Sequence, residues 1–140
     1  MNQSKLATVL NANGLSKTVQ RQAVFDALSS NEPLSMHELV EKLAGRVDRV
    51  STYRTVALYE KLGILQRLTH GFKYKLELSD NFNQHHHHLT CTNCGKVIDV
   101  KADAIEGTIG LIAQENNFRL ISHQIEIQGK CADCAKLSDN

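Results

Sequence analysis

The amino-acid sequence predicts an α+β protein, in which an N-terminal winged helix-turn-helix domain precedes a small α/β domain with a four-cysteine zinc site. Three observations lead to this fold class. Three helical patterns are followed by two short strand patterns, a polar segment interrupts the regular patterns, and all four cysteines occur in two Cys-x-x-Cys pairs. We therefore expect a winged-helix domain of the kind that binds DNA over residues 1–78, a hinge over 79–84 and a metal-binding domain over 85–140.

The composition favours a soluble, cytoplasmic protein. Of the 140 residues 41% are apolar, and no apolar run approaches the roughly 18 residues that span a membrane. No signal-peptide core follows Met1–Lys5, so we expect reduced cysteines. The net charge is +1, but residues 1–82 hold 11 Lys and Arg against 8 Asp and Glu, whereas residues 83–140 hold 5 against 7. Any binding to DNA is therefore expected in the first half.

The first two helices are bounded by turn and capping residues. One helical pattern follows Gly14–Ser16 and ends near Ser29–Asn31. The sequence Ser35-Met-His-Glu38 is a capping-box signature, because each of the two outer side chains can bond the backbone N–H of the other. The second helix should run to about Ala44, where Gly45 ends it.

The third helix and a hairpin complete the first domain. The helix should begin around Val50–Thr52 and end at Gly63. One side of it is expected to carry Tyr53, Val56, Ala57 and Glu60. Residues 64–67 and 73–78 read as two short strands around His70-Gly71. Two helices joined by a short turn and followed by a hairpin are typical of a winged helix-turn-helix.

The second half alternates strands with one helix. The predicted elements are strand 89–90, strand 96–100, helix 103–116 and strand 118–128. The last strand alternates, with one face expected to carry Ile121, His123, Ile125 and Ile127.

The four cysteines predict a closed zinc site. Cys91 and Cys94 form one pair, and Cys131 and Cys134 form the other. Two such pairs supply the four thiolates of a tetrahedral structural site, which neither pair can supply alone. The alternatives are two redox dithiols or buried thiols. The spacing and the reducing context favour zinc, which would join the last strand to the first.

Four consecutive histidines, His85–His88, lie just before the first cysteine pair. An expression tag is the simple alternative, although tags rarely stand inside structured sequence. Side chains alternate in an extended segment, so His85 and His87 should face one way and His86 and His88 the other. The alternation therefore predicts two different metal sites that share one strand.

Each histidine pair needs further donors, and the sequence offers candidates. His123 and Glu106 are candidates for the first pair, with a satisfied core histidine and a helix cap as the alternative readings. Asp99 and Glu77 are candidates for the second pair, with ordinary surface charge as the alternative.

Taken together, these motifs resemble the ferric uptake regulator family of bacterial metalloregulators over nearly the whole chain. The resemblance is carried by Ser51-Thr52-Tyr53-Arg54, by the histidine run with its Leu-Thr-Cys-x-x-Cys-Gly-Lys continuation, by Ser122-His123 and by Cys131-x-x-Cys134. It implies a DNA-binding winged helix, a hinge and an α/β dimerisation domain. It also implies a homodimer that binds double-stranded operator DNA when loaded with metal and represses transcription.

The resemblance implies two ligand sets besides the structural Zn²⁺ of the cysteines. The family's second-domain site corresponds here to His85, His87, Glu106 and His123. The regulatory site beside the hinge corresponds to Glu77, His86, His88 and Asp99, and it would take Zn²⁺, Fe²⁺ or Mn²⁺.

Two departures from the family pattern favour zinc as the sensed metal. Many iron- and peroxide-responsive members supply a further histidine ligand where this chain has Pro33, and His37 is either a substitute or an exposed helix residue. Iron-type members commonly carry Asp where this chain has His87. Nitrogen-rich ligation suits zinc, although imidazole binds both metals. The run His85–His88 together with Ser122-His123-Gln-Ile-Glu-Ile also resembles the zinc uptake regulators of this family, although the cysteine that many of those place in the regulatory site is absent.

The start of the third helix is expected to read DNA. There Ser51, Thr52, Tyr53 and Arg54 would enter the major groove. Arg54 could bond a guanine edge, and Tyr53 would either touch thymine methyls or pack in the core. Phosphate contacts are expected from Lys17, Arg21, Arg67 and Lys73.

Other classes of function have weaker support. A zinc hydrolase would need an open metal position, and no separate nucleophile, general-base motif or small-molecule substrate site is evident. A peroxide sensor of the same family would use iron to oxidise a histidine ligand. A zinc-ribbon interaction module would leave the Ser51–Arg54 helix without a role.

Overall fold

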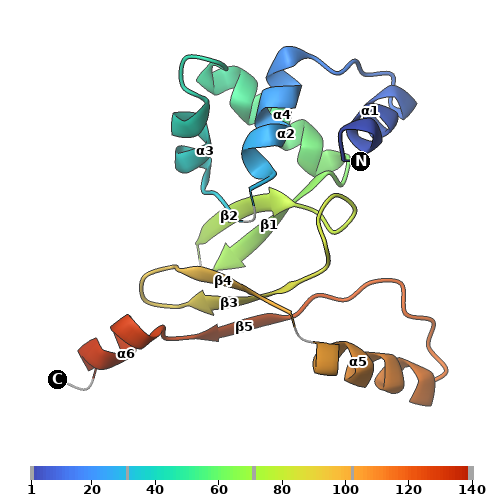
Figure 1. Cartoon of the computed structure of the whole chain (residues 1–140), viewed down its shortest axis with the longest axis vertical. Helices are drawn as coiled ribbons and strands as arrows, with labels where there is room; N and C mark the ends of the chain where they lie inside the picture. The colour runs from blue at the N-terminus through green and yellow to red at the C-terminus, as the bar shows by residue number, and fades with distance from the viewer. Residues whose placement is uncertain (1, 31, 71, 102, 139–140) are drawn as a thin grey trace. The chain divides into compact units, whose positions relative to one another are not determined.

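The computed structural model describes residues 2–30, 32–70, 72–101 and 103–138, and it divides the chain into two compact units (Figure 1). The first unit is Met1–Gln84 and the second is His85–Asn140. The mixture of helices and sheets confirms the α+β fold class. Within the described ranges, no helix is long and apolar enough to cross a bilayer.

The first unit contains four helices above a two-stranded hairpin. Its elements are α1 (Asn2–Ala12), α2 (Val19–Leu28), α3 (Met36–Leu43), α4 (Arg49–Lys61), β1 (Leu65–His70) and β2 (Lys73–Leu78). Helix α2 packs against α3, α4 and β2, so α3 and α4 form a helix-turn-helix with the antiparallel hairpin as its wing. Strand β1 begins one residue later than predicted and extends to His70.

Helix α1 was not predicted from the sequence. Its buried positions are only Leu6 and Leu10, so its apolar stripe is narrow and most of its other side chains face solvent. Both leucines join the core of the first unit, which supplies the stability that the helix lacks by itself.

The capping box of α3 forms as predicted. The Ser35 hydroxyl accepts a hydrogen bond from the Glu38 backbone N–H at 3.2 Å, and the Ser35 N–H donates to the Glu38 carboxylate at 2.7 Å. These bonds from Ser35 hold the pKa of the Glu38 carboxyl below its usual value. Helix α4 likewise ends as expected, because Gly63 takes the left-handed conformation, with φ of 67°.

Helix α4 begins earlier than predicted and buries a mainly polar set of side chains. Asp48 caps it by accepting from the Ser51 N–H at 2.9 Å, so the helix starts at Arg49 rather than around Val50. Its buried side chains are Thr52, Thr55, Val56 and Tyr59. Three of these carry hydroxyl groups, which need hydrogen-bond partners when they are buried. The Tyr59 hydroxyl, for example, donates to the Arg21 carbonyl at 2.8 Å. Apolar periodicity alone therefore does not identify the buried face of this helix.

Residues 79–84, which the sequence predicts as a hinge, pack largely onto the first unit. Phe82 is 4% exposed and meets Phe25 edge to face at 5.5 Å between ring centroids. Its carbonyl accepts from the Asn2 side chain at 2.7 Å, and the Ser79 hydroxyl donates to the Gly63 carbonyl at 2.7 Å. This segment is therefore part of the folded unit up to at least Phe82.

The second unit is a three-stranded sheet flanked by two helices. Its elements are β3 (His87–Cys91), β4 (Val97–Val100), α5 (Asp103–Glu115), β5 (Glu126–Gly129) and α6 (Ala132–Ser138). The strand order is β4-β3-β5, so β3 is central, antiparallel to β4 and parallel to β5. Helix α6, which carries Cys134, was not predicted.

The predicted strand over residues 118–128 is wrong for most of its length. Only Glu126–Gly129 pairs with β3, and residues 118–125 run as irregular chain. Ile121 is 91% exposed, so its place in the alternation does not correspond to a buried sheet face in a single chain. The alternation therefore includes a side chain, Ile121, that the described part of the chain leaves largely uncovered.

We predict that Phe82→Ala lowers the free energy of unfolding of the first unit by about 3–5 kcal/mol, because it removes a buried aromatic side chain. Urea unfolding followed by the helical circular dichroism signal measures the change. Phe72→Ala is the matched control, since Phe72 is 108% exposed and its loss should change the free energy by less than about 0.5 kcal/mol. Equal unfolding midpoints for the two variants would contradict the packing of residues 79–82.

Candidate metal centres

The four cysteines converge at one end of the central strand. Cys91 ends β3, Cys94 lies in the turn toward β4, Cys131 follows β5 and Cys134 lies in α6. Their sulfur atoms all lie within 4.8 Å of one another. The parallel pairing of β3 with β5 sets Cys91 beside Gly129, two residues before Cys131, which brings the two pairs together.

The sulfur geometry fits zinc and does not fit a disulfide. The Cys94 and Cys131 sulfurs are 3.8 Å apart, and none of the four cysteines is in a disulfide. A tetrahedron with Zn–S bonds of about 2.3 Å has edges of about 3.8 Å, whereas a disulfide needs about 2.05 Å. The Cys131 N–H also donates to the Cys91 sulfur at 3.3 Å. The backbone N–H groups of Cys131 and Cys94 lower the pKa of the Cys91 thiol to about 5, which favours the metal-binding thiolate.

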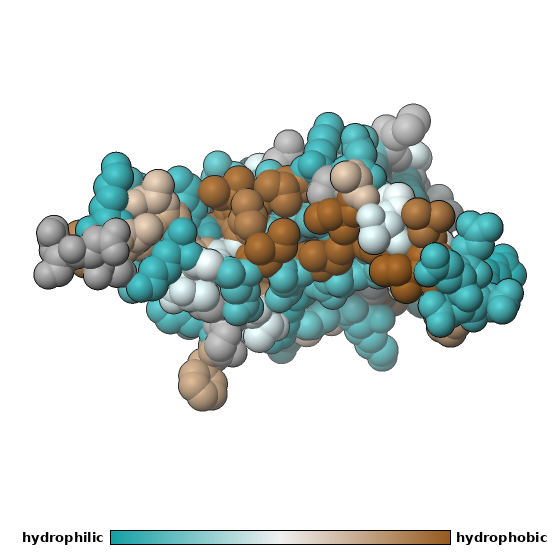
Figure 2. All heavy atoms as spheres, turned by 90° about the horizontal axis from the view of Figure 1, so that it is seen from below, coloured by the Kyte–Doolittle hydropathy of each residue, from teal (hydrophilic) through white to brown (hydrophobic). Residues whose placement is uncertain are grey.

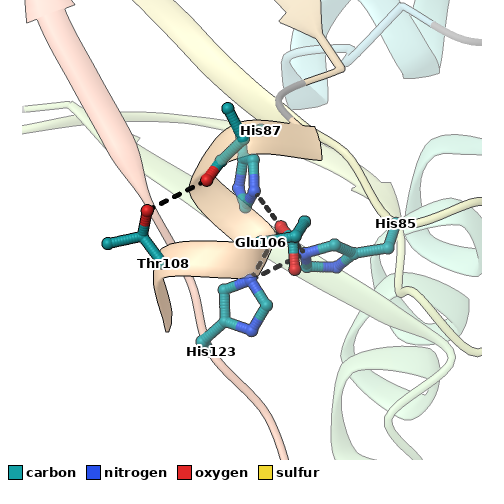
Figure 3. A network of polar contacts seen from close by, with 6 residues as sticks. His85, His87, Glu106, Thr108 and His123 are labelled. Atoms are coloured by element: carbon teal, nitrogen blue, oxygen red, sulfur yellow. Dashed lines mark hydrogen bonds and ion pairs between the residues drawn. The ribbon is translucent and has the colours of Figure 1, made fainter. Parts of the chain in front are cut away.

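A second group of donors gathers around Glu106, in the first turn of α5. Figure 3 shows the imidazoles of His85, His87 and His123 turned toward its carboxylate. Oxygen Oε1 of Glu106 lies 2.5 Å from His87 Nε2, 3.0 Å from His123 Nε2 and 3.3 Å from His85 Nε2. His85 Nε2 and His123 Nε2 are 3.0 Å apart. The structure therefore brings together all four residues that the sequence proposed for the second-domain site.

This arrangement fits a four-coordinate metal ion. Three nitrogens and one oxygen at about 2.0–2.1 Å from zinc would stand about 3.3 Å apart, close to most of the separations found. His87 is 2% exposed, and a buried imidazole needs either a polar partner or a metal. Hydrogen bonding to His123, and then to His87, holds the pKa of the Glu106 carboxyl below its usual value, so the carboxylate form is favoured.

The opposite side of β3 carries a second pair of histidines. The rings of His86 and His88 are 4.7 Å apart between centroids. Asp99 on β4 is the direct cross-strand partner of His88, and its Oδ1 lies 3.6 Å from His88 Nε2 and 4.0 Å from His86 Nε2. Glu77, the remaining residue of the regulatory set, belongs to the first unit, where it lies on β2 and is buried.

Pro33, which replaces the family's further histidine ligand, and His37, the residue considered as its substitute, lie before and on α3. His37 is on the solvent-exposed side of the helix, and its Nε2 lies 3.4 Å from Glu41 Oε1 in an i,i+4 pair. It therefore has the arrangement of an exposed helix residue, which was one of its two predicted readings. Pro33 is buried just before the helix.

The predicted DNA-reading residues divide into exposed and buried positions. Tyr53 is 43% exposed and lies beside Arg49, and Arg54 is also exposed, so both are accessible near the start of α4. Thr52 is fully buried, and its hydroxyl donates to the Asp48 carbonyl at 3.0 Å. Thr52 is therefore a core residue rather than a DNA contact, and this part of the sequence prediction is corrected. Ser51 is partly exposed, with its N–H used by the cap.

The four side chains predicted to contact phosphate differ in whether their charge is already paired within the fold. Lys17 bonds Gln3 at 3.1 Å and remains exposed, and Lys73 is exposed at the start of β2. Arg21 donates to the Ser16 carbonyl. Arg67 pairs with Glu60 of α4 at 2.7 Å and stacks over Tyr74. Arg67 is thus partly neutralised within the fold, so Lys17 and Lys73 are the better phosphate candidates.

One contact beside a predicted ligand was missed from the sequence. The Gln66 side chain donates a hydrogen bond to Oε1 of Glu77 at 2.6 Å. Gln66 stands directly opposite Glu77 in the hairpin. Both strands were predicted, so a predicted register between them would have identified the pair.

Comparison with known proteins gives a consistent set of relatives. The family model described as the ferric uptake regulator family matches residues 12–128. A ferric uptake regulation protein of Shigella flexneri is 32% identical over 132 residues, which cover 90% of this chain and 88% of that protein. The solved structure of the Helicobacter pylori ferric uptake regulator has a TM-score of 0.80 at 26% identity, covering 96% of this chain and 91% of that one. That of the Vibrio cholerae ferric uptake regulator has a TM-score of 0.73 at 32% identity, covering 89% and 98%.

We predict that Cys91→Ser abolishes the zinc content of the cysteine site and the fold of the second unit. Structural zinc supplies folding free energy, on the order of 10 kcal/mol in zinc-finger peptides, and three thiolates hold it far less tightly. Elemental analysis and thermal melting measure both effects. Thr92→Ser, at an exposed position in the same turn, is the control and should behave as the wild type. A Cys91→Ser protein with full zinc content and an unchanged melting temperature would refute the assignment.

Proposed function

The chain belongs to the ferric uptake regulator family, whose members are transcription regulators and not enzymes, and from this premise we propose a metal-dependent repressor that binds operator DNA as a metal-loaded homodimer in the cytoplasm. The hydrolase and zinc-ribbon alternatives lose their support, because the family match extends over both units. The proposal concerns the sensed metal, the DNA contacts and the dimer.

The observation that carries the proposal is the division of donors along β3. His87 and Glu106 lie in one group, His88 and Asp99 lie in another, and Cys91 ends the same strand. Because successive side chains of a strand point to opposite faces, one short strand supplies ligands to three sites. The Helicobacter pylori relative is itself described as having three functional metal binding sites.

We assign the sensing role to Glu77 together with His86, His88 and Asp99. Glu77 is on the wing strand β2 of the first unit, whereas in the second unit His88 is on β3, Asp99 is on β4 and His86 lies just before β3. A metal ion bound by all four residues would restrict how the DNA-binding unit is oriented. The metal raises DNA affinity only by its preference for the DNA-binding arrangement, and DNA tightens metal binding by the same factor.

Zinc is the metal that the donor sets favour. The group around Glu106 has three nitrogen donors and one oxygen, and the regulatory set has two nitrogens and two carboxylates. Four donors of this kind match the tetrahedral coordination of Zn²⁺, whereas Fe²⁺ and Mn²⁺ commonly take five or six ligands. The histidine ligand that many iron- and peroxide-responsive members add is replaced here by Pro33. An iron-, manganese- or peroxide-responsive regulator is the alternative within the family.

Exposed apolar side chains support the homodimer. Helix α5 has no buried residue, and Leu111 and Ile112 are 60% and 55% exposed. Figure 2 shows apolar side chains gathered in a band over one face. The apolar residues of the second unit with large exposure also include Phe118, Leu120, Ile121 and Ile127. A second copy of the chain is the partner that would cover this surface.

We predict that His86→Ala combined with His88→Ala abolishes the effect of metal on DNA binding. In the wild type, zinc should raise affinity by roughly 5–150-fold, the usual range of coupling between two sites. Fluorescence anisotropy with a duplex selected from a random pool measures the effect at buffered free zinc.

The control for this experiment is His37→Ala, which removes an exposed histidine paired only with Glu41 among its described contacts. It should keep the full response to zinc. A zinc response in the double variant equal to that of the control would exclude His86 and His88 from sensing.

We predict that Arg54→Ala weakens binding to the selected duplex more than binding to random DNA. A two-bond contact to a guanine edge is worth about 1–3 kcal/mol, whereas a phosphate contact affects all sequences equally. Competition titrations with both duplexes measure the ratio. Arg46→Ala, which removes an exposed charge just before α4, is the control and should lower both affinities alike. Equal losses for Arg54→Ala would make Arg54 a phosphate contact.

A further inference from the structure

Gln66 and Glu77 form a directly opposed pair in the wing. They are cross-strand partners in the antiparallel pairing of β1 with β2, and Gln66 Nε2 lies 2.6 Å from Glu77 Oε1. Glu77 is 4% exposed. A carboxylate only accepts hydrogen bonds, so the Gln66 amide must present its NH₂ group and its orientation is fixed.

The strand that carries Gln66 is itself held in place. The next residue, Arg67, pairs with Glu60 of α4 at 2.7 Å and stacks over Tyr74 at 4.2 Å. The backbone position of Gln66 is therefore fixed by α4 on one side and by β2 on the other. A donor fixed in this way constrains the Glu77 carboxylate in both position and rotation.

We propose that Gln66 is a positioning residue that sets the metal preference of the regulatory site by holding Glu77 to coordination through one oxygen. This inference rests on the proposed regulatory role of Glu77. With Oε1 engaged by Gln66, Glu77 supplies a single donor, and the set of Glu77, His86, His88 and Asp99 supplies four. Four donors suit tetrahedral Zn²⁺.

The chemical alternative to one-oxygen coordination is a chelating carboxylate. A Glu77 free to rotate would offer both oxygens and raise the number of donors to five. A larger, more oxygen-rich set favours Mn²⁺ and Fe²⁺ over Zn²⁺. Gln66 therefore disfavours the binding of Mn²⁺ and Fe²⁺ as well as favouring that of Zn²⁺.

The test replaces Gln66 with Met, which keeps the length of the side chain and removes the donor. The full-length protein keeps zinc in its cysteine site and carries His85→Ala and His87→Ala, so that added metal reports on the regulatory site alone. Competition with a chromophoric chelator gives the affinities for Zn²⁺ and Mn²⁺. The visible spectrum of bound Co²⁺ reports coordination number, because four-coordinate Co²⁺ absorbs strongly and five- or six-coordinate Co²⁺ absorbs weakly.

We expect Gln66→Met to lower zinc affinity on the order of 10–100-fold, the usual effect of losing a partner that orients a ligand. Manganese affinity should change less, and the Co²⁺ absorption should weaken. Thr69→Ala is the matched control, since Thr69 is exposed on the same strand and faces Tyr74, and it should change none of these values. Gln66→Leu serves as a second variant, and thermal melting of the variants before regulatory metal is added verifies their folding.

Several outcomes separate this inference from the function on which it rests. Zinc affinity and Co²⁺ spectrum unchanged in both Gln66 variants would overturn the role of Gln66, provided that Glu77→Ala abolishes regulatory zinc binding. Equal losses for zinc and manganese would also overturn it, because they indicate a general distortion rather than metal preference. If Glu77→Ala leaves zinc affinity unchanged, the regulatory assignment of Glu77 fails, and the inference fails with it.

Discussion

The alternation of side chains along β3 is the constraint on which the three donor groups depend. With a period of two, His87 turns toward Glu106 and His88 turns toward Asp99, while Cys91 closes the strand among the other thiols. A shift of one residue in the pairing with β4 would exchange the two histidine faces. Zinc bound by the four cysteines would oppose such a shift, because Cys91 ends β3 and Cys94 lies in the turn to β4.

We expect the second unit to depend strongly on metal, because its described part has almost no apolar core. The apolar core cluster ends at Phe82, and Cys91 and Cys134 are the only buried apolar side chains in the described part of the second unit. Helix α5 contributes none. So small an apolar interior cannot offset the conformational entropy of ordering the chain. The proposed zinc at the thiolates and the proposed second copy over the exposed apolar surface would supply the stability that this interior does not.

Local signals in the sequence predicted the features that depend on neighbouring residues. The capping box of Ser35 and Glu38 and the left-handed Gly63 are such features. Features that depend on the rest of the fold were missed. Helix α1 shows little pattern beyond Leu6 and Leu10, and α4 turns the polar Thr52 inward because Asp48 satisfies its hydroxyl. The strand predicted to begin at residue 118 forms only from Glu126, and Ile121 in the part that does not form faces outward in a single chain.

The central claim is that metal at the wing-strand carboxylate and the second histidine pair controls DNA binding. The most direct test removes this metal while keeping the cysteine zinc, and then titrates Zn²⁺, Fe²⁺ and Mn²⁺ under buffered free-metal conditions while affinity for a selected duplex is measured. We predict that zinc restores tight binding at the lowest free concentration, and that DNA tightens zinc binding by the same factor. Equal DNA affinity with and without added metal would contradict the account.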